Sequence, residues 1–183
     1  MSQGGAPARQ TFMTNTNPHS AHLLRAAAGE VLDGDPGSVI RLLADPESTG
    51  GLLTSNRSLL RAGSDGAPPH YHRRSAELFF VLDGRLTVLL DDDIVTLEKG
   101  DLLVVPPGTP HAFAPEADAD ADVLFVFTPG TARFEYFRLL DKAHRGEAGW
   151  ELIAESQDRF DNHYVESPAW RAAISSTGSS STA

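Results

Sequence analysis

Short apolar runs, separated by clusters of turn-forming residues, occupy the middle of this sequence. Apolar and polar positions alternate within several of these runs, and the clusters between them are rich in glycine, proline and aspartate. This spacing is typical of the strands of an antiparallel barrel or sandwich. The pattern predicts strands at residues 22–25, 38–43, 51–61, 78–82, 85–90, 94–97, 101–105, 111–113 and 123–128.

Two polar segments between these runs predict turns. Asp83-Gly84 is a hairpin signal, because glycine readily adopts the positive φ that a two-residue turn requires. Residues 116–122 repeat alanine and aspartate, which predicts a solvated hairpin tip.

The periodicity becomes helical after residue 130. In residues 131–143, Phe134, Phe137 and Leu140 recur at helical spacing, which predicts a helix that packs this face on the barrel. A lid over a substrate is the alternative role for the same face. A second helical stretch is expected around residues 149–156.

These patterns divide the chain into four segments. We expect a flexible arm at residues 1–18, a barrel at 19–130, a helical extension at 131–173 and a disordered Ser/Thr/Gly tail at 174–183. His163 lies in the extension without a spaced partner, so we interpret it as structural rather than as a ligand.

Composition narrows the classes of function. A chain of 183 residues suits one domain with a substantial core. The absence of cysteine excludes disulfides, thiolate ligands and cysteine nucleophiles. A net charge of −10 argues against nucleic acid or an anionic membrane as a partner.

The sequence also predicts where the protein resides. No apolar run reaches the ~18 residues of a membrane span, and residues 1–10 lack the apolar core of a signal peptide. We therefore expect a cytoplasmic protein. Arginine far outnumbers lysine and alanine is abundant, a bias typical of bacterial genomes of high GC content.

Four residues in the predicted barrel suit a mononuclear metal site. His70 and His72 are two apart and share one face of a strand, Glu77 follows shortly, and His111 comes from a later segment. An isolated histidine pair beside prolines is often only a surface feature. The four together instead predict a bound ion.

The ligand types limit the metal without selecting one. Imidazole and carboxylate suit Ni, Fe, Mn, Co, Cu or Zn as a divalent ion, and ligand identity alone does not choose among these. Four protein ligands would leave one or two positions for water, substrate or dioxygen, which favours a catalytic site over a structural one.

The two ligand segments resemble the paired motifs of the cupin superfamily. The first family motif, G(X)5HXH(X)3-4E(X)6G, fits from His70 through Glu77 to Gly84. The second, G(X)5PXG(X)2H(X)3N, fits from Gly100 to His111. The leading glycine is replaced by Ser64 and the final asparagine by Pro115, departures that bear on loop geometry and not on a ligand.

This resemblance implies an all-β fold, the double-stranded β-helix or jelly-roll barrel, here followed by C-terminal helices. No internal repeat is visible, so a single cupin domain is expected rather than two. Small bacterial quercetin 2,3-dioxygenase-like proteins have the same arrangement. Likeness to them implies metal ligation by His70, His72, Glu77 and His111, with Glu77 also acting as the catalytic acid or base.

Strand alternation predicts which side chains surround the metal. If Glu77 points inward, Phe79 and Val81 share its face, and Phe113 lies beside His111. These three residues would form a substrate pocket, or they would simply fill the barrel. Leu78, Phe80 and Leu82 would then face outward and favour a homodimer.

We therefore expect a metal-dependent dioxygenase that uses dioxygen on a flavonol-like or other aromatic, polyphenolic small molecule. Two alternatives remain. A polyketide cyclase or isomerase would use the metal as a Lewis acid without oxygen, and a non-catalytic cupin would only bind its ligand. No DNA-binding helix pair precedes the predicted barrel, which disfavours a transcription regulator.

Overall fold

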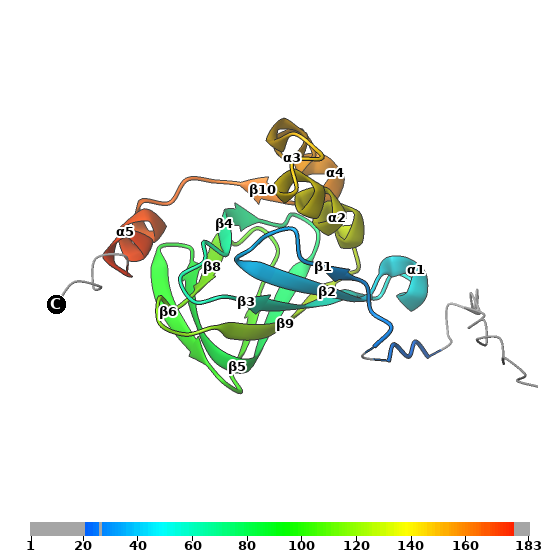
Figure 1. Cartoon of the computed structure of the whole chain (residues 1–183), viewed down its shortest axis with the longest axis horizontal. Coiled ribbons are helices and arrows are strands. Elements are labelled where there is room, and N and C mark those ends of the chain that lie inside the picture. The colour runs from blue at the N-terminus through cyan, green and yellow to red at the C-terminus, as the bar shows by residue number, and fades with distance from the viewer. Residues whose placement is uncertain (1–20, 26, 178–183) are drawn as a thin grey trace, which may run out of the picture.

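The computed structural model describes residues 21–25 and 27–177, in which antiparallel strands precede most of the helices (Figure 1). The predicted arm at 1–18 lies outside the described residues. The strands are β1 (Val31–Leu32), β2 (Ser38–Ala44), β3 (Thr54–Leu60), β4 (Ala67–Tyr71), β5 (Ala76–Leu90), β6 (Asp93–Glu98), β7 (Leu102–Val105), β8 (His111–Pro115), β9 (Ala121–Thr128) and β10 (His163–Tyr164). The helices are α1 (Pro46–Thr49), α2 (Arg133–His144), α3 (Trp150–Glu155), α4 (Gln157–Phe160) and α5 (Pro168–Thr177).

The strands form a jelly-roll barrel in which β5 belongs to both walls. The hydrogen-bonded order is β1-β2-β3-β9-β5-β8-β4-β10, and β6 and β7 also pair with β5. The first half of β5 pairs with β9 and β7, and its second half pairs with β8 and β6. The predicted all-β barrel with C-terminal helices is confirmed.

The hairpin predicted at Asp83-Gly84 is wrong, because β5 runs through both residues without a turn. The register against β9 shifts between Val81 and Asp83, so the strand bends from one wall into the other. Gly84 has φ 77°, and a Cβ there would lie 1.8 Å from the carbonyl oxygen of Asp120. The glycine is needed for close backbone approach at a bend, not for a hairpin.

Two other local expectations are also wrong. Residues 22–25 form no strand, and Leu23 is 69% exposed. The segment contacts β2 through a side chain, with His22 Nε2 3.2 Å from Leu43 O. The acidic loop between β8 and β9 is not a hairpin tip, because these two strands do not pair with each other and instead lie on either side of β5. Its Asp120 instead accepts hydrogen bonds from the Ala62 backbone and the Arg61 side chain.

The core fills the barrel with alternate side chains from facing strands. Inward residues of β5 and β9 are fully buried, in line with the two-residue period of a strand. The main cluster contains Leu60, Phe79, Val81, Leu86, Val88, Leu97, Val105, Ala121, Val123, Phe125 and Phe127. This packing fixes the inward direction of Glu77, which shares the period of Phe79 and Val81.

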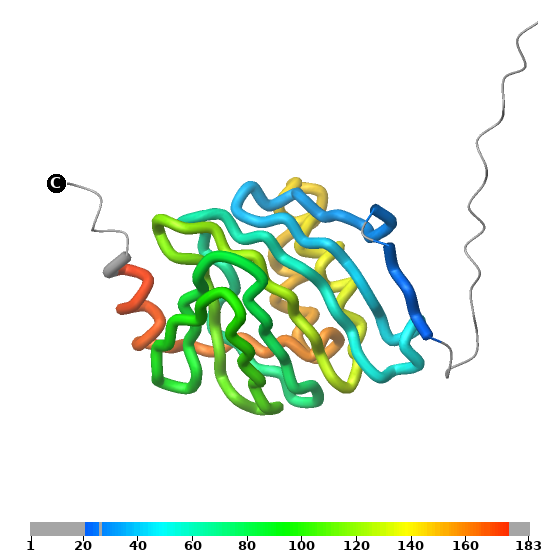
Figure 2. The backbone as a smooth tube through the Cα atoms, turned by 90° about the horizontal axis from the view of Figure 1, so that it is seen from below, coloured from blue at the N-terminus to red at the C-terminus, as the bar shows by residue number. Residues whose placement is uncertain are grey.

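The C-terminal segment packs on the barrel in two places. In Figure 1, α2, α3 and α4 group beside β4 and β10, whereas α5 lies near β6. Trp170 of α5 is buried against Leu89, Ala112 and Ala114. Figure 2 shows the connection from β10 to α5 crossing the barrel.

This segment differs from the predicted extension in two respects. It contributes strand β10, which pairs with β4 and so extends the wall that carries His70. The tail predicted at residues 174–183 is helical up to Thr177, where α5 ends, and its remaining residues lie outside the described ranges. None of the helices in the described ranges is long and apolar enough to cross a membrane.

Two glycine substitutions test the bend in β5. Gly84→Ala should destabilise the protein by more than about 3 kcal/mol, because the new Cβ overlaps backbone as well as requiring positive φ. Gly100→Ala is the matched control, since Gly100 has φ 93° but open space around its Cβ position. It should cost only ~1–2 kcal/mol. Urea unfolding of both variants measures the difference, and equal losses would contradict the bend.

Candidate metal centre

Three strands bring the predicted ligands together. His70 lies on β4, His72 directly after it, Glu77 on β5 and His111 at the start of β8. Pairing of β4 with β8 places His70 directly opposite His111. The four candidate ligand atoms lie within 4.8 Å of one another, and all four side chains are buried.

A backbone carbonyl fixes the proton of each histidine ring. A carbonyl oxygen can only accept, so each Nδ1 must donate, and a neutral ring then has a lone pair at Nε2. Such carbonyl bonds orient metal-ligating histidines in general. The pairs are His70 Nδ1 with Pro68 O (2.8 Å), His72 Nδ1 with Asp161 O (2.6 Å) and His111 Nδ1 with Thr109 O (2.9 Å).

The Glu77 carboxylate faces these lone pairs. Its Oε2 lies 3.0 Å from His72 Nε2 and 2.8 Å from His111 Nε2. Two electron-rich atoms at this separation need a proton or a cation between them. The contacts therefore suit a positively charged species held by nitrogen and oxygen together.

The electrostatics favour the protonation states that a metal needs. Burial lowers the pKa of His70 well below its ordinary value and lowers the pKa of His72, so both rings are held neutral. Burial alone would raise the pKa of Glu77, but its close contacts with the His111 and His72 rings outweigh burial and place that pKa well below its usual range. Neutral imidazoles and an ionised carboxylate are the ligating forms.

The donor set fits a divalent transition metal. Three imidazole nitrogens and one carboxylate oxygen suit borderline first-row ions. The chain has no cysteine, so sulfur plays no part in the ligand set. The group can therefore hold one metal ion whose identity the ligands do not select.

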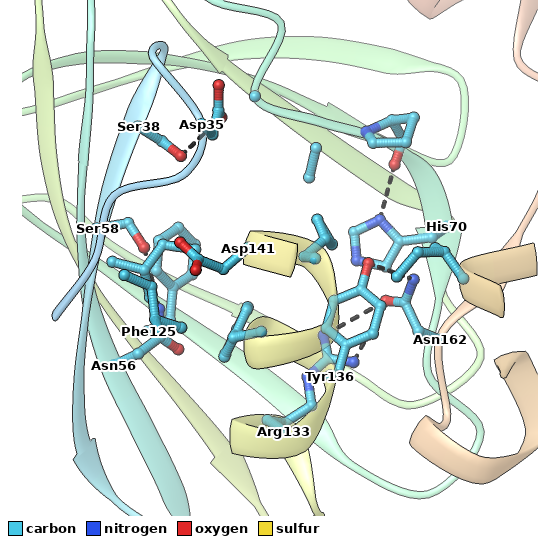
Figure 3. Close-up of a pocket in the computed structure, with 18 of the residues that line it drawn as sticks. Asp35, Ser38, Asn56, Ser58, His70, Phe125, Arg133, Tyr136, Asp141 and Asn162 are labelled. Carbon is cyan, nitrogen blue, oxygen red and sulfur yellow. Dashed lines mark hydrogen bonds between the residues drawn. The ribbon is translucent and has the colours of Figure 1, made fainter. Parts of the chain in front are cut away.

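A cavity of about 470 Å³ opens beside this group (Figure 3). His70 and Glu77 reach its wall from the metal side, and Asn56 and Ser58 of β3 line another part of it. The remaining lining is largely apolar and aromatic, and comes from both the barrel and the helices. It includes Phe113, Phe125, Phe127, Tyr136, Phe137, Leu140, Trp150 and Ile153. The size and the mixed lining are those of a small-molecule site.

The predicted pocket residues occupy two different positions. Phe113 lines the cavity. Phe79 and Val81 are fully buried in the core instead. Phe79 meets the rings of Phe113 and Phe125 at centroid distances of 5.4 and 5.0 Å, so these rings lie between it and the cavity. The two-residue period correctly predicted that Phe79 and Val81 face the inside of the barrel. It could not predict which inward residues lie next to the cavity.

Helix α2 presents a slightly different face from the predicted one. Phe137 and Leu140 line the cavity, whereas Phe134 does not. The buried positions on the cavity side include Arg133 and Tyr136. The charged first turn obscured this face, because an arginine is seldom expected among buried aromatic residues.

The segment at residues 161–162 supports the site from far along the chain, and sequence reasoning missed it. Asp161 has φ 53°, and its carboxylate accepts hydrogen bonds from the backbone of Arg73 and Arg74, both 2.9 Å. Its carbonyl oxygen meanwhile holds His72. The predicted structural histidine, His163, stacks on Tyr71 and is not one of the four grouped ligands.

Comparisons with known proteins agree with this geometry. The family described as "Cupin domain" matches residues 57–127. Quercetin 2,3-dioxygenase of Bacillus subtilis is 36% identical over 108 residues, which are 57% of this chain and 31% of that protein. The tetracenomycin polyketide synthase protein TcmJ of Streptomyces glaucescens is 27% identical over 99 residues, 54% of this chain and 66% of that protein. The chain thus spans less than two thirds of either relative.

Solved structures resemble the barrel. KdgF from Halomonas sp. superposes with a TM-score of 0.55 at 22% identity, over 63% of this chain and 99% of that one. An RmlC-like cupin from Shewanella frigidimarina gives a TM-score of 0.54 at 23% identity, over 63% and 96%. At this identity the likeness concerns the fold alone.

Removal of one ligand tests the metal centre. His111→Ala should lower the bound metal from near one ion per chain to below about a tenth, because a buried nitrogen donor is lost. It should also abolish the rise in melting temperature on adding Ni(II), Fe(II) or Mn(II), since an ion stabilises only the state that binds it. Elemental analysis and thermal unfolding measure both effects.

His144→Ala is the control, because His144 lines the cavity but is outside the ligand group. It should retain metal. Well-folded wild-type protein that neither contains an ion nor gains stability from one would contradict the site.

Proposed function

We propose that this chain, which belongs to the cupin superfamily, is a metal-dependent dioxygenase of a flavonol-like or other aromatic, polyphenolic small molecule. The observation that carries the proposal is the meeting of three inward Nε2 atoms and one carboxylate at the wall of an aromatic cavity. Similarity to quercetin 2,3-dioxygenase, over part of that protein, supports the choice of reaction.

His70, His72, Glu77 and His111 would hold the ion. When bound, it would supply positive charge to a coordinating substrate oxygen and, if redox-active, a route to dioxygen. Four protein ligands leave room for such oxygens.

The chain's own residues would bind and orient the substrate. Phe113, Phe125 and Phe127 offer ring faces and edges against which a planar aromatic molecule can pack. Helix α2 covers the same space with Tyr136 and Phe137, which would exclude water from the reacting atoms.

Glu77 is the proposed acid or base. Its depressed pKa makes it a weak base, so it would accept a proton only from a hydroxyl that is itself acidic. A flavonol hydroxyl beside a carbonyl meets this requirement better than an ordinary alcohol.

A second candidate is a polyketide cyclase or isomerase. The similarity to a tetracenomycin polyketide synthase protein favours it, and the same ligands would serve a Lewis-acid reaction without oxygen consumption. A protein that only binds its ligand would show no oxygen uptake, and the mass of the ligand would not change.

The proposed assembly is a homodimer through the outer face of β5, β7 and β9. Leu78 pairs with Val104 and Val126, and Phe80 pairs with Leu102 and Leu124, which forms two rows of three apolar side chains. Leu102 is 60% and Val104 53% exposed. A second copy of the chain would cover this block, because adjoining exposed apolar residues at a sheet edge favour association.

Substitution of Glu77 tests the chemistry. Planar polyphenols and β-diketones would be screened for oxygen uptake and product mass together. With the substrate found, Glu77→Gln should lower turnover per bound metal by about a hundredfold, because general acid–base catalysis contributes on this scale. Glu77→Asp should be intermediate, since it keeps the charge but shortens the reach.

Gain of two oxygen atoms supports the dioxygenase. Product of unchanged mass, or mass reduced by water, without oxygen uptake would favour the cyclase or isomerase. Full turnover per metal in Glu77→Gln would remove the acid–base role.

A charge placed in the apolar block tests the dimer. Val104→Lys should weaken association by about tenfold or more, because the ammonium group would be desolvated in the interface. Ile94→Lys makes the same change on β6, outside the block, where Ile94 is also exposed. Light scattering at micromolar concentration should find wild type and Ile94→Lys dimeric. A monomeric wild type would refute the proposed assembly.

A further inference from the structure

Arg133, in the first turn of α2, is a buried cation in the cavity wall. Its exposure is 3%, and Figure 3 shows it in the group with Tyr136 and Asn162. The guanidinium carbon lies 4.4 Å from the ring centre of Phe127 and 5.1 Å from that of Tyr136. Aromatic faces accommodate a guanidinium but do not neutralise it.

The hydrogen bonds of the Arg133 side chain are all long. Nη1 donates to Phe160 O and to Asn162 Oδ1 at 3.3 Å, and Nη2 donates to the same Asn162 oxygen at 3.4 Å. Nε has no hydrogen-bond partner among the described residues. A guanidinium bound to an anion forms shorter, often paired bonds, so much of its donor capacity is unused here.

The fourth contact of Arg133 depends on the metal ligands. Nη2 lies 3.4 Å from His72 Nε2, the same atom that would ligate an ion. A lone pair engaged by a metal no longer accepts a hydrogen bond. Metal binding would therefore leave an Nη2 donor without an acceptor, directly beside the coordination site.

The charges around this point lead to the same conclusion. Two carboxylates favour the charged form of Arg133, Glu77 more strongly than Asp161. Asp161 is shared among other groups: it accepts from the backbone of Arg73 and Arg74, and it lies 3.4 Å from His163 Nε2 and 3.6 Å from Arg74 Nε. Glu77 is therefore the main carboxylate that balances Arg133. A divalent ion would add two positive charges to the Glu77 and Arg133 pair. Buried net charge is unfavourable unless it is paired, so an anionic ligand is required.

We infer that the Arg133 guanidinium binds an anionic oxygen, from a carboxylate or an enolate, on the apolar molecule that occupies the cavity. The oxygen would lie between the metal and Arg133, while the aromatic walls enclose the rest of the molecule. The inference deepens the proposed function, on which it rests, by making the substrate an aromatic organic anion. Arg133 would then select for charge as well as hold α2 in place.

Binding of matched probes tests this in the full-length protein. The probes are 3-hydroxyflavone with flavone, for an enolate, and 2-naphthoate with its methyl ester, for a carboxylate. Affinities would be measured by titration with zinc-loaded protein, in which no oxidation occurs, and with metal-free protein. Wild type should bind at least one anion-forming probe about tenfold or more tightly than its neutral match.

The variants separate Arg133 from the metal and from helix stability. Arg133→Gln should reduce the anion preference by about tenfold to a hundredfold, and Arg133→Lys, which keeps the charge but loses the fork, should reduce it less. Lys142→Gln removes an exposed cation from the same helix and should change nothing. Melting temperature and metal content identify any variant that fails to fold.

Two results would overturn the inference. One is a wild type with no preference for either anionic probe, a measurement that needs no variant. The other is an Arg133→Gln variant that folds and keeps the anion preference of the wild type. If Arg133→Gln does not fold, the same result for Arg133→Lys would overturn the inference.

The probe pair that shows the preference identifies whether a carboxylate or an enolate provides the anionic oxygen that Arg133 binds. Preserved anion preference without oxygen uptake on any substrate refutes the dioxygenase alone. Oxygen uptake without anion preference refutes the role of Arg133 alone.

Discussion

Three hydrogen bonds from histidine Nδ1 atoms to backbone carbonyl oxygens are the constraint on which the site depends. They determine which ring nitrogen carries the proton, and so they leave the Nε2 lone pairs of His72 and His111 facing Glu77 and that of His70 free to bind an ion. Without these bonds each ring could rotate or change tautomer, and the ring nitrogen that faces the buried carboxylate would not be fixed. Two of the carbonyls come from residues two positions before their histidines, Pro68 on β4 and Thr109 in the connection that precedes β8. The third, from Asp161, joins His72 to a segment 89 residues away.

The barrel makes these bonds possible through a single long strand. Because β5 crosses from one wall to the other, its first half positions Glu77 while its second half pairs with β8, which begins at His111. Gly84 permits the crossing where the backbone of Asp120 leaves no space for a side chain. Core packing along β5 also directs Glu77 inward, because Glu77 shares the strand face of the buried Phe79 and Val81.

Sequence spacing predicted the ligand group because its determinants are local. A strand's two-residue period relates His70 to His72, and motif spacing brings in Glu77 and His111. Arg133 and Asp161 could not be found in this way, since each meets the site through tertiary contacts that no fixed spacing encodes. The error at Gly84 has a related cause: a positive φ serves both a hairpin and a bend, and only the partner strands distinguish them.

The described segment that follows β9 lies outside the stretch that matches the cupin domain. The cupin family match ends at residue 127, whereas Arg133, Tyr136, Trp150 and Asn162, all in the cavity wall, lie beyond it. The four grouped residues thus lie within the matched stretch, whereas part of the cavity wall is encoded after it. Substitutions in the later stretch can alter which molecule is admitted while the ligand set stays intact. The helices can therefore change the shape and charge of the cavity independently of the strands that carry the four grouped residues.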